Sequence, residues 1–139
     1  MLTLPRQGSD RGSDRRSDRG SATAETVIVV PLAFLVLMTV VQFGVWAHAT
    51  HIAHAAATTG LAAARADGRT AAAGQREATG LLATLGGGGL LDDPVIVTTR
   101  EPDRATVRVE GTAASVVPGL RLPVRVEVSG PVDRFVPGG

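Results

Sequence analysis

The longest apolar block of the sequence covers residues 26–47 and contains no charged side chain. As a helix it would be about 33 Å long at roughly 1.5 Å per residue, which matches a hydrocarbon core of about 30 Å. Gln42 is its one clearly polar interruption, and Trp46 lies near its far end, where membrane helices often carry aromatic residues. The block therefore predicts one transmembrane helix. A buried helix of a soluble protein is disfavoured, because no other segment is apolar enough to surround it.

The sequence after this block keeps a helical character. Residues 48–66 are rich in alanine and contain no proline, so we expect the membrane helix to continue outward, since alanine is the best helix former. Gly60 is a weak point of this extension, and Asp67-Gly68 is a plausible break. Residues 70–85 then place three leucines at helical spacing, which predicts a second helix that ends at a run of four glycines.

The C-terminal part changes its period from helical to alternating. Residues 95–99 form a short β-branched run, and residues 105–112 and 123–129 alternate valine with charged or polar side chains. Such alternation predicts half-buried strands, and the turn residues 101–103 predict that the first two strands form a hairpin. The expected fold is a membrane-anchored α+β protein: a long N-terminal transmembrane helix extending outward, a second short helix, and a small antiparallel sheet of about three strands. The valine face of the sheet should pack against the leucine-bearing second helix.

Four segments follow from this pattern. Residues 1–20 repeat a Gly-Ser-Asp-Arg unit, have almost nothing to bury, and should form a disordered cytoplasmic leader. Residues 21–48 form the transmembrane helix, residues 49–86 an extracytoplasmic Ala-rich helical region, and residues 87–139 a small β domain.

The arginine distribution predicts the orientation in the membrane. Five arginines precede the apolar block, whereas the next basic residue after it is Arg65. Because positively charged flanks stay in the cytoplasm, the N-terminus should be cytoplasmic and the C-terminus extracytoplasmic.

Composition narrows the class of protein further. All 14 basic residues are arginine, and abundant alanine and glycine accompany them, which suggests a GC-rich bacterial genome. The net charge of +1 gives little support for a nucleic-acid partner. The absence of cysteine excludes disulfides and thiolate sites. We expect no catalytic residues, no cofactor, no metal and no small-molecule substrate, and therefore a structural protein rather than an enzyme.

The entrance of the apolar block carries a more specific pattern. The leader ends in Gly20, a small polar residue, Ser21, follows, and Glu25 stands at the fifth position from Ser21, directly before the long apolar helix. This arrangement resembles a type III, prepilin-type signal. Together with Pro31 and with Gln42-Phe43-Gly44, it is similar to the TadE-like family of minor pilins or pseudopilins of tight-adherence (Tad, Flp-type) pilus systems.

Further residues support the same resemblance. The family typically continues into an Ala-rich helix with a Gly-x-x-Ala-Arg-like stretch, and residues 60–65 read Gly-Leu-Ala-Ala-Ala-Arg. Two positions depart from its pattern. Thr26 stands where Phe or Tyr usually follows the glutamate, and Gln42 replaces the usual Glu before Phe-Gly.

The resemblance implies a pilus assembly protein in the bacterial inner membrane. A prepilin peptidase would cut between Gly20 and Ser21, and its partners would be other pilins and Tad pilus assembly proteins, with incorporation into a pilus left open. The new ammonium of Ser21 could pair with Glu25 of its own or a neighbouring chain. We expect Glu25, Pro31 and the Gln42-Phe43-Gly44 stretch to serve helix packing and assembly. For Glu25, a favourable interaction with the helix dipole is an alternative role that is compatible with the first.

Other readings of the same region remain as alternatives. A Sec signal peptide would be cut after Ala49, but its apolar region would be longer than the usual 7–15 residues. Polar residues follow Arg15-Arg16 where a twin-arginine signal needs apolar ones. The alternative function is an unprocessed single-pass cell-envelope protein with an extracytoplasmic binding module.

The sequence also contains three regularly spaced histidines that a metal site could use. His48, His51 and His54 sweep about 120° of a helix, so two of them could touch one ion but three would be strained. We therefore interpret them as a hydrated helix face rather than as a zinc site.

Overall fold

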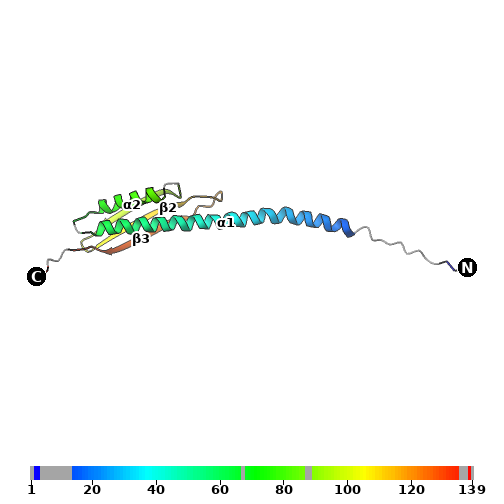
Figure 1. Ribbon diagram of the computed structural model, residues 1–139, viewed down its shortest axis with the longest axis horizontal. Coiled ribbons are helices and arrows are strands. Elements are labelled where there is room, and N and C mark those ends of the chain that lie inside the picture. The colour runs from blue at the N-terminus through cyan, green and yellow to red at the C-terminus, as the bar shows by residue number, and fades with distance from the viewer. Residues whose placement is uncertain (1, 4–13, 67, 87–88, 135–137, 139) are drawn as a thin grey trace. The chain divides into compact units, whose positions relative to one another are not determined.

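A computed structural model describes residues 2–3, 14–66, 68–86, 89–134 and 138 (Figure 1). Along the chain the elements are α1 (Asp14–Arg65), α2 (Ala71–Leu85), β1 (Leu91–Arg100), β2 (Arg104–Ala113) and β3 (Pro123–Pro131). The chain divides into two compact units, Met1–Leu37 and Met38–Gly139. The predicted order of a long apolar helix, a short helix and a three-stranded antiparallel sheet is confirmed.

The first unit contains the N-terminal part of α1. The helix begins at Asp14, inside the segment 1–20 for which the sequence predicts disorder, while residues 4–13 of that segment lie outside the described residues. Pro31 lies inside the helix without ending it. The large apolar side chains that follow Glu25 are exposed in this unit: Val27, Ile28, Val29, Val30, Leu32, Phe34, Leu35, Val36 and Leu37. Within the described residues, one helical segment, Glu25–Arg65, is long and apolar enough to cross a membrane.

The second unit contains the sheet, whose strand order is β1-β2-β3 with both pairs antiparallel. Residues 101–103 form the predicted turn between β1 and β2, closed by a hydrogen bond of 2.7 Å from the Glu101 N–H to the Arg104 carbonyl. The alternation in β2 buries Val107 and Val109 completely on one face and leaves the charged residues on the other. The hairpin and the half-buried strands are therefore confirmed.

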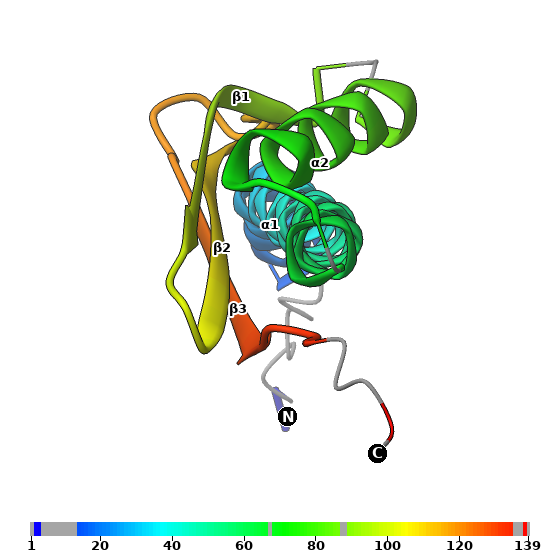
Figure 2. The ribbon, with the colours of Figure 1, turned by 90° about the vertical axis from the view of Figure 1, so that its left-hand side faces the viewer.

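The core of the second unit lies between the alanine-rich face of α1, the valine face of the sheet and α2. Figure 2 shows α1 and α2 on the same side of the sheet. Of the leucines in α2 only Leu82 is buried, whereas Leu85 is 47% exposed. The expected packing of the valine face against the leucine-bearing helix is present through Leu82. Helix α1 covers this face as well, because its small alanine side chains let it lie close to the sheet. Among the described residues, the buried apolar side chains that α1 contributes to this core are Ala49, Ile52, Ala53, Ala56, Ala57, Leu61 and Ala64.

Two glycines allow α1 and α2 to pack in close contact. A Cβ on Gly60 would lie 2.8 Å from the Gly74 carbonyl oxygen, and a Cβ on Gly74 would lie 2.6 Å from the Gly60 carbonyl oxygen. Both distances are shorter than van der Waals contact, so any side chain here would push the helices apart. Helix α1 continues through Gly60, which is a packing position rather than the weak point that the sequence suggests.

Two arginines fasten the C-terminal end of α1 to the sheet. The Arg100 guanidinium, from the end of β1, donates hydrogen bonds to the carbonyls of Ala64 and Ala66. Arg65 donates from Nε to the Pro131 carbonyl over 2.7 Å, and its own carbonyl accepts from the Asp133 N–H at 3.0 Å. The last carbonyls of a helix lack partners within the helix, so these contacts both satisfy them and fix the register of α1 on the sheet.

Candidate functional site

Gln42 is the polar residue in the predicted span, and its side chain is fully buried in the second unit. Its Nε2 donates to the Ala114 carbonyl at 3.0 Å, and its Oε1 accepts from the N–H groups of Val116 and Val117 at 2.6 and 3.1 Å. A polar side chain in an apolar helix is costly unless it is paired. The loop between β2 and β3 supplies that pairing, and it uses both the donor and the acceptor of the amide.

The loop itself, residues 114–122, has a defined conformation. Pro118 and Gly119 occupy the centre of a β-turn closed by a 3.1 Å bond from the Leu120 N–H to the Val117 carbonyl, and Gly119 has φ +82°. A type II turn requires a residue that adopts a positive φ at its third position, here Gly119, and proline is common directly before it. The Ser115 hydroxyl lies within 2.7 Å of the Val117 carbonyl oxygen and 3.1 Å of that of Leu120. Ser115 therefore braces the turn.

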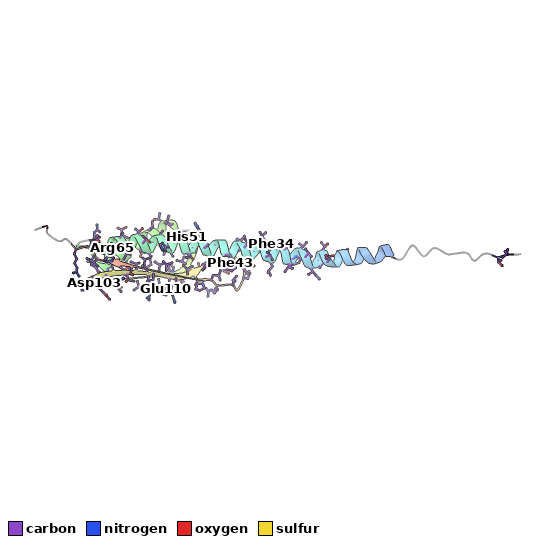
Figure 3. All side chains as sticks on the ribbon, turned by 90° about the horizontal axis from the view of Figure 1, so that it is seen from below. Phe34, Phe43, His51, Arg65, Asp103 and Glu110 are labelled. Carbon is purple, nitrogen blue, oxygen red and sulfur yellow. The ribbon has the colours of Figure 1, made fainter. Side chains whose placement is uncertain are left out.

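A second contact holds the first residue of β3, directly after this loop, to α1. The indole Nε1 of Trp46 donates to the Pro123 carbonyl at 3.0 Å. Trp46 also packs edge-to-face against Phe43, with ring centroids 6.5 Å apart. Figure 3 places Phe43 and Arg65 toward opposite ends of the part of α1 that lies along the sheet. Gln42 and Trp46 thus bind the loop and the start of β3 at the N-terminal end of the part of α1 that lies along the sheet. The contacts of Arg65 and Arg100 hold its C-terminal end.

The remaining predicted assembly residues of α1 are accessible. Phe43 is 52% exposed, and a Cβ added to Gly44 would meet no atom within 4 Å. Glu25 is also exposed. Phe43 contacts Trp46 within this chain but keeps half of its surface accessible. The role of Phe43, Gly44 and Glu25 in contacts between subunits stays a prediction.

The predicted processing site lies within helix α1. Gly20 is exposed, and a Cβ at this position would meet nothing within 4 Å. The backbone of Ser21 belongs to the same helix. The Gly20–Ser21 peptide bond is therefore not covered by packing at Gly20, and cleavage at this bond remains a prediction.

The three histidines lie on the solvent side of α1. His48, His51 and His54 are all exposed, and the His54 ring is 3.4 Å from the hydroxyl of Thr58. In the part of the chain that the structure describes, no group of three or more metal-ligating side chains comes together.

The face of the sheet that points away from the helices combines charge and exposed valine. Arg108 pairs with Glu127 at 2.6 Å, and Arg125 pairs with Glu110 at 3.0 Å, each across β2 and β3. The Glu127 carboxylate raises the pKa of Arg108, first through its hydrogen bond and then through its charge. Exposed pairs of this kind add little to stability. On β1, this face continues with two exposed valines, Val95 and Val97.

Several important contacts were not predicted from the sequence. The β2–β3 loop, its anchor Trp46 and the helix-capping Arg100 all act through contacts between residues far apart in sequence; Gln42 and Ala114, for example, are 72 positions apart. The Pro118-Gly119 pair was an available turn signal. A partner for Gln42 could also have been expected, since a lone amide in an apolar helix must find one.

Comparison with known proteins agrees with the resemblance at the N-terminal part. The family model described as TadE-like protein matches residues 20–61. No curated protein and no solved structure matches the chain. The matched segment begins at Gly20, contains Glu25 and the Gln42-Phe43-Gly44 stretch, and ends one residue after the glycine at which α1 crosses α2. Residues 20–61 of this chain are therefore a TadE-like segment, and this match associates the chain with Tad pilus systems.

Proposed function

We propose that the chain is a minor pilin or pseudopilin of a Tad-type pilus or secretion system, with a structural rather than a catalytic role. The observation that carries the proposal is the coincidence of two features. The TadE-like match begins at Gly20, and the exposed apolar stretch of α1 begins directly after Glu25. A segment with this many exposed apolar side chains needs lipid or other subunits around it.

In this proposal α1 serves two stages in succession. Before assembly, its apolar part holds the protein in the inner membrane, with the leader in the cytoplasm and the sheet outside. After a prepilin peptidase cuts between Gly20 and Ser21, the new ammonium pairs with Glu25 and sets the register of neighbouring helices. The ion-paired face of the sheet, carrying Arg108 and Glu127, is the surface offered to other pilus components.

The N-terminus of the protein purified from its own membranes tests the processing step. We expect the product to begin at Ser21 in cells that contain the peptidase and to keep its leader in cells that lack it. Gly20→Val should leave the leader intact. Gly12→Val is the matched control, because no glutamate stands at the fifth position after that glycine, and it should be processed normally.

Two other results at the N-terminus would contradict the proposal. A leader that is intact in peptidase-containing cells supports the unprocessed single-pass envelope protein instead. A soluble product that begins at Thr50 supports a Sec signal peptide.

A further inference from the structure

The β2–β3 loop presents apolar side chains next to the apolar part of α1. Apart from Ser115, Gly119 and Arg121, every residue between 114 and 122 is apolar. Val116 is 37% exposed directly before the turn, and Pro118 is exposed at its centre. Loops are usually polar because they face water, so this composition needs a separate explanation.

The loop is held at a fixed position along the predicted span. Gln42 binds its first half through three hydrogen bonds, and Trp46 binds its end at Pro123. Both anchors belong to the uncharged block 26–47. The loop therefore lies beside residues that the length of the block assigns to the membrane.

The length of the apolar helix places these residues at the bilayer boundary. The stretch 26–41, which precedes Gln42, covers only about 24 Å at roughly 1.5 Å per residue, whereas the hydrocarbon core is about 30 Å thick. The remainder has to come from residues 42–47. These are the residues that contact the loop, so the loop reaches the level at which acyl chains meet the headgroups.

The backbone of the loop is suited to that environment. Peptide groups are costly in a membrane when they have no hydrogen-bond partner. In this loop the N–H groups of Val116 and Val117 bind Gln42, the Leu120 N–H binds the Val117 carbonyl, and Pro118 has no N–H. At the ends of the loop, the Ala113 N–H donates to the Leu122 carbonyl and the Ala114 N–H to the Leu90 carbonyl.

We propose that the β2–β3 loop inserts its turn, with Val116 and Pro118, into the headgroup boundary of the lipid bilayer, so that the sheet is docked on the outer surface of the membrane. The exposed cation Arg121 lies beside the apolar residues, a combination that suits phosphate headgroups. Insertion of the loop fixes the distance of the sheet from the bilayer, and its orientation on the bilayer surface, before assembly. This inference rests on the membrane anchoring in the proposed function.

Single cysteines with an environment-sensitive fluorophore test the insertion, because the chain has no cysteine of its own. Val116→Cys reports on the loop, Val36→Cys on the anchor, and Ser129→Cys is the control on an exposed part of β3. Each labelled full-length protein is reconstituted into phosphatidylethanolamine–phosphatidylglycerol vesicles. Quenching is then measured with nitroxide lipids labelled near the headgroup or deep in the acyl chain, and with aqueous iodide.

We expect the label at position 116 to lose at least about half of its fluorescence to the shallow nitroxide, because an inserted segment lies about 5–10 Å into the boundary. The label at position 36 should be quenched by the deep nitroxide, and the label at position 129 by iodide alone.

The possible outcomes distinguish a failure of the loop insertion from a failure of the membrane anchoring on which it rests. If position 36 is quenched by lipid and position 116 only by iodide, the loop is in water and the insertion is wrong while the anchor stands. If position 116 is protected from both quenchers, a second copy of the chain covers it, which also overturns the insertion. If position 36 is not quenched by lipid, the anchoring itself fails, and the insertion fails with it.

Discussion

Replacing Gln42 with leucine isolates the contact that attaches the loop to the helix. The substitution keeps a side chain of similar size but removes the bonds to the Ala114 carbonyl and to the N–H groups of Val116 and Val117. A hydrogen bond of this kind contributes about 1 kcal/mol net, and the loss of a partner for a buried group costs about 1–3 kcal/mol. Leucine recovers part of that loss through apolar burial. We therefore expect the docked loop to be destabilised by about 2–3 kcal/mol.

Hydrogen exchange measures this effect at the atoms concerned. Opening of the loop exposes the amides of Val116 and Val117, and a loss of about 2–3 kcal/mol accelerates their exchange about 30- to 160-fold when exchange follows the local opening equilibrium. The full-length protein is studied in detergent micelles, with peptides covering residues 114–122. Peptides from the β1–β2 hairpin should be much less affected, since this contact lies outside that hairpin.

The matched control is Gln75→Leu, the same substitution at an exposed position of α2. It should leave exchange in the loop unchanged. If Gln42→Leu also leaves the amides of the loop as protected as in the unchanged protein, Gln42 does not hold the loop. The loop would then not be fixed beside the span by this contact.

Two further substitutions test how α1 is packed in the second unit. Gly74→Ala should lower the free energy of unfolding by about 1–3 kcal/mol through overpacking against α1, whereas its control Gly80→Ala, where a Cβ meets nothing within 4 Å, should raise it by up to about 1 kcal/mol. Thermal unfolding in detergent, followed by circular dichroism, compares the two variants, and equal effects would contradict the close packing of α1 on α2. Arg100→Met should lower the free energy of unfolding by about 1.5–3 kcal/mol, because the charged donor to the last carbonyls of α1 is lost, whereas Arg104→Met, at an exposed position, should change it little. Hydrogen exchange at the C-terminal end of α1 should be faster in the Arg100 variant alone. Equal exchange rates in both variants would rule out the capping role of Arg100.

The elements of the fold were predictable because each depends on a local pattern. The uncharged block, the leucine spacing in α2 and the alternation in β2 and β3 each specify one element without reference to the rest. The turn at residues 101–103 follows from its own residue types in the same way. The structure confirms all of these elements.

Predictions of the packing were less complete, because alanine gives an ambiguous signal. Its abundance in residues 48–66 was interpreted as helix propensity, although the same small side chains, such as Ala53 and Ala57, form the face of α1 that lies on the sheet. Gly60 likewise is a poor helix former in isolation, and only the position of Gly74 on the partner helix shows why it is there.

The site was predictable only in part, for a similar reason. The sequence marks Gln42 only as the polar interruption of the span, and the resemblance assigns it to helix packing. Its observed partners lie 72–75 positions away in the β2–β3 loop. No local pattern connects residues at that separation, so the contact could be identified only after the strands and the helix were placed together.

The central claim is that this chain takes part in building a Tad pilus. Its most direct test is the number of pili on the surface of its own bacterium, counted by electron microscopy, after the gene for the chain is deleted and then restored. We expect the deletion to reduce strongly or abolish the pili, and the unchanged chain to restore them. Cells that carry the normal number of pili without this chain would contradict it.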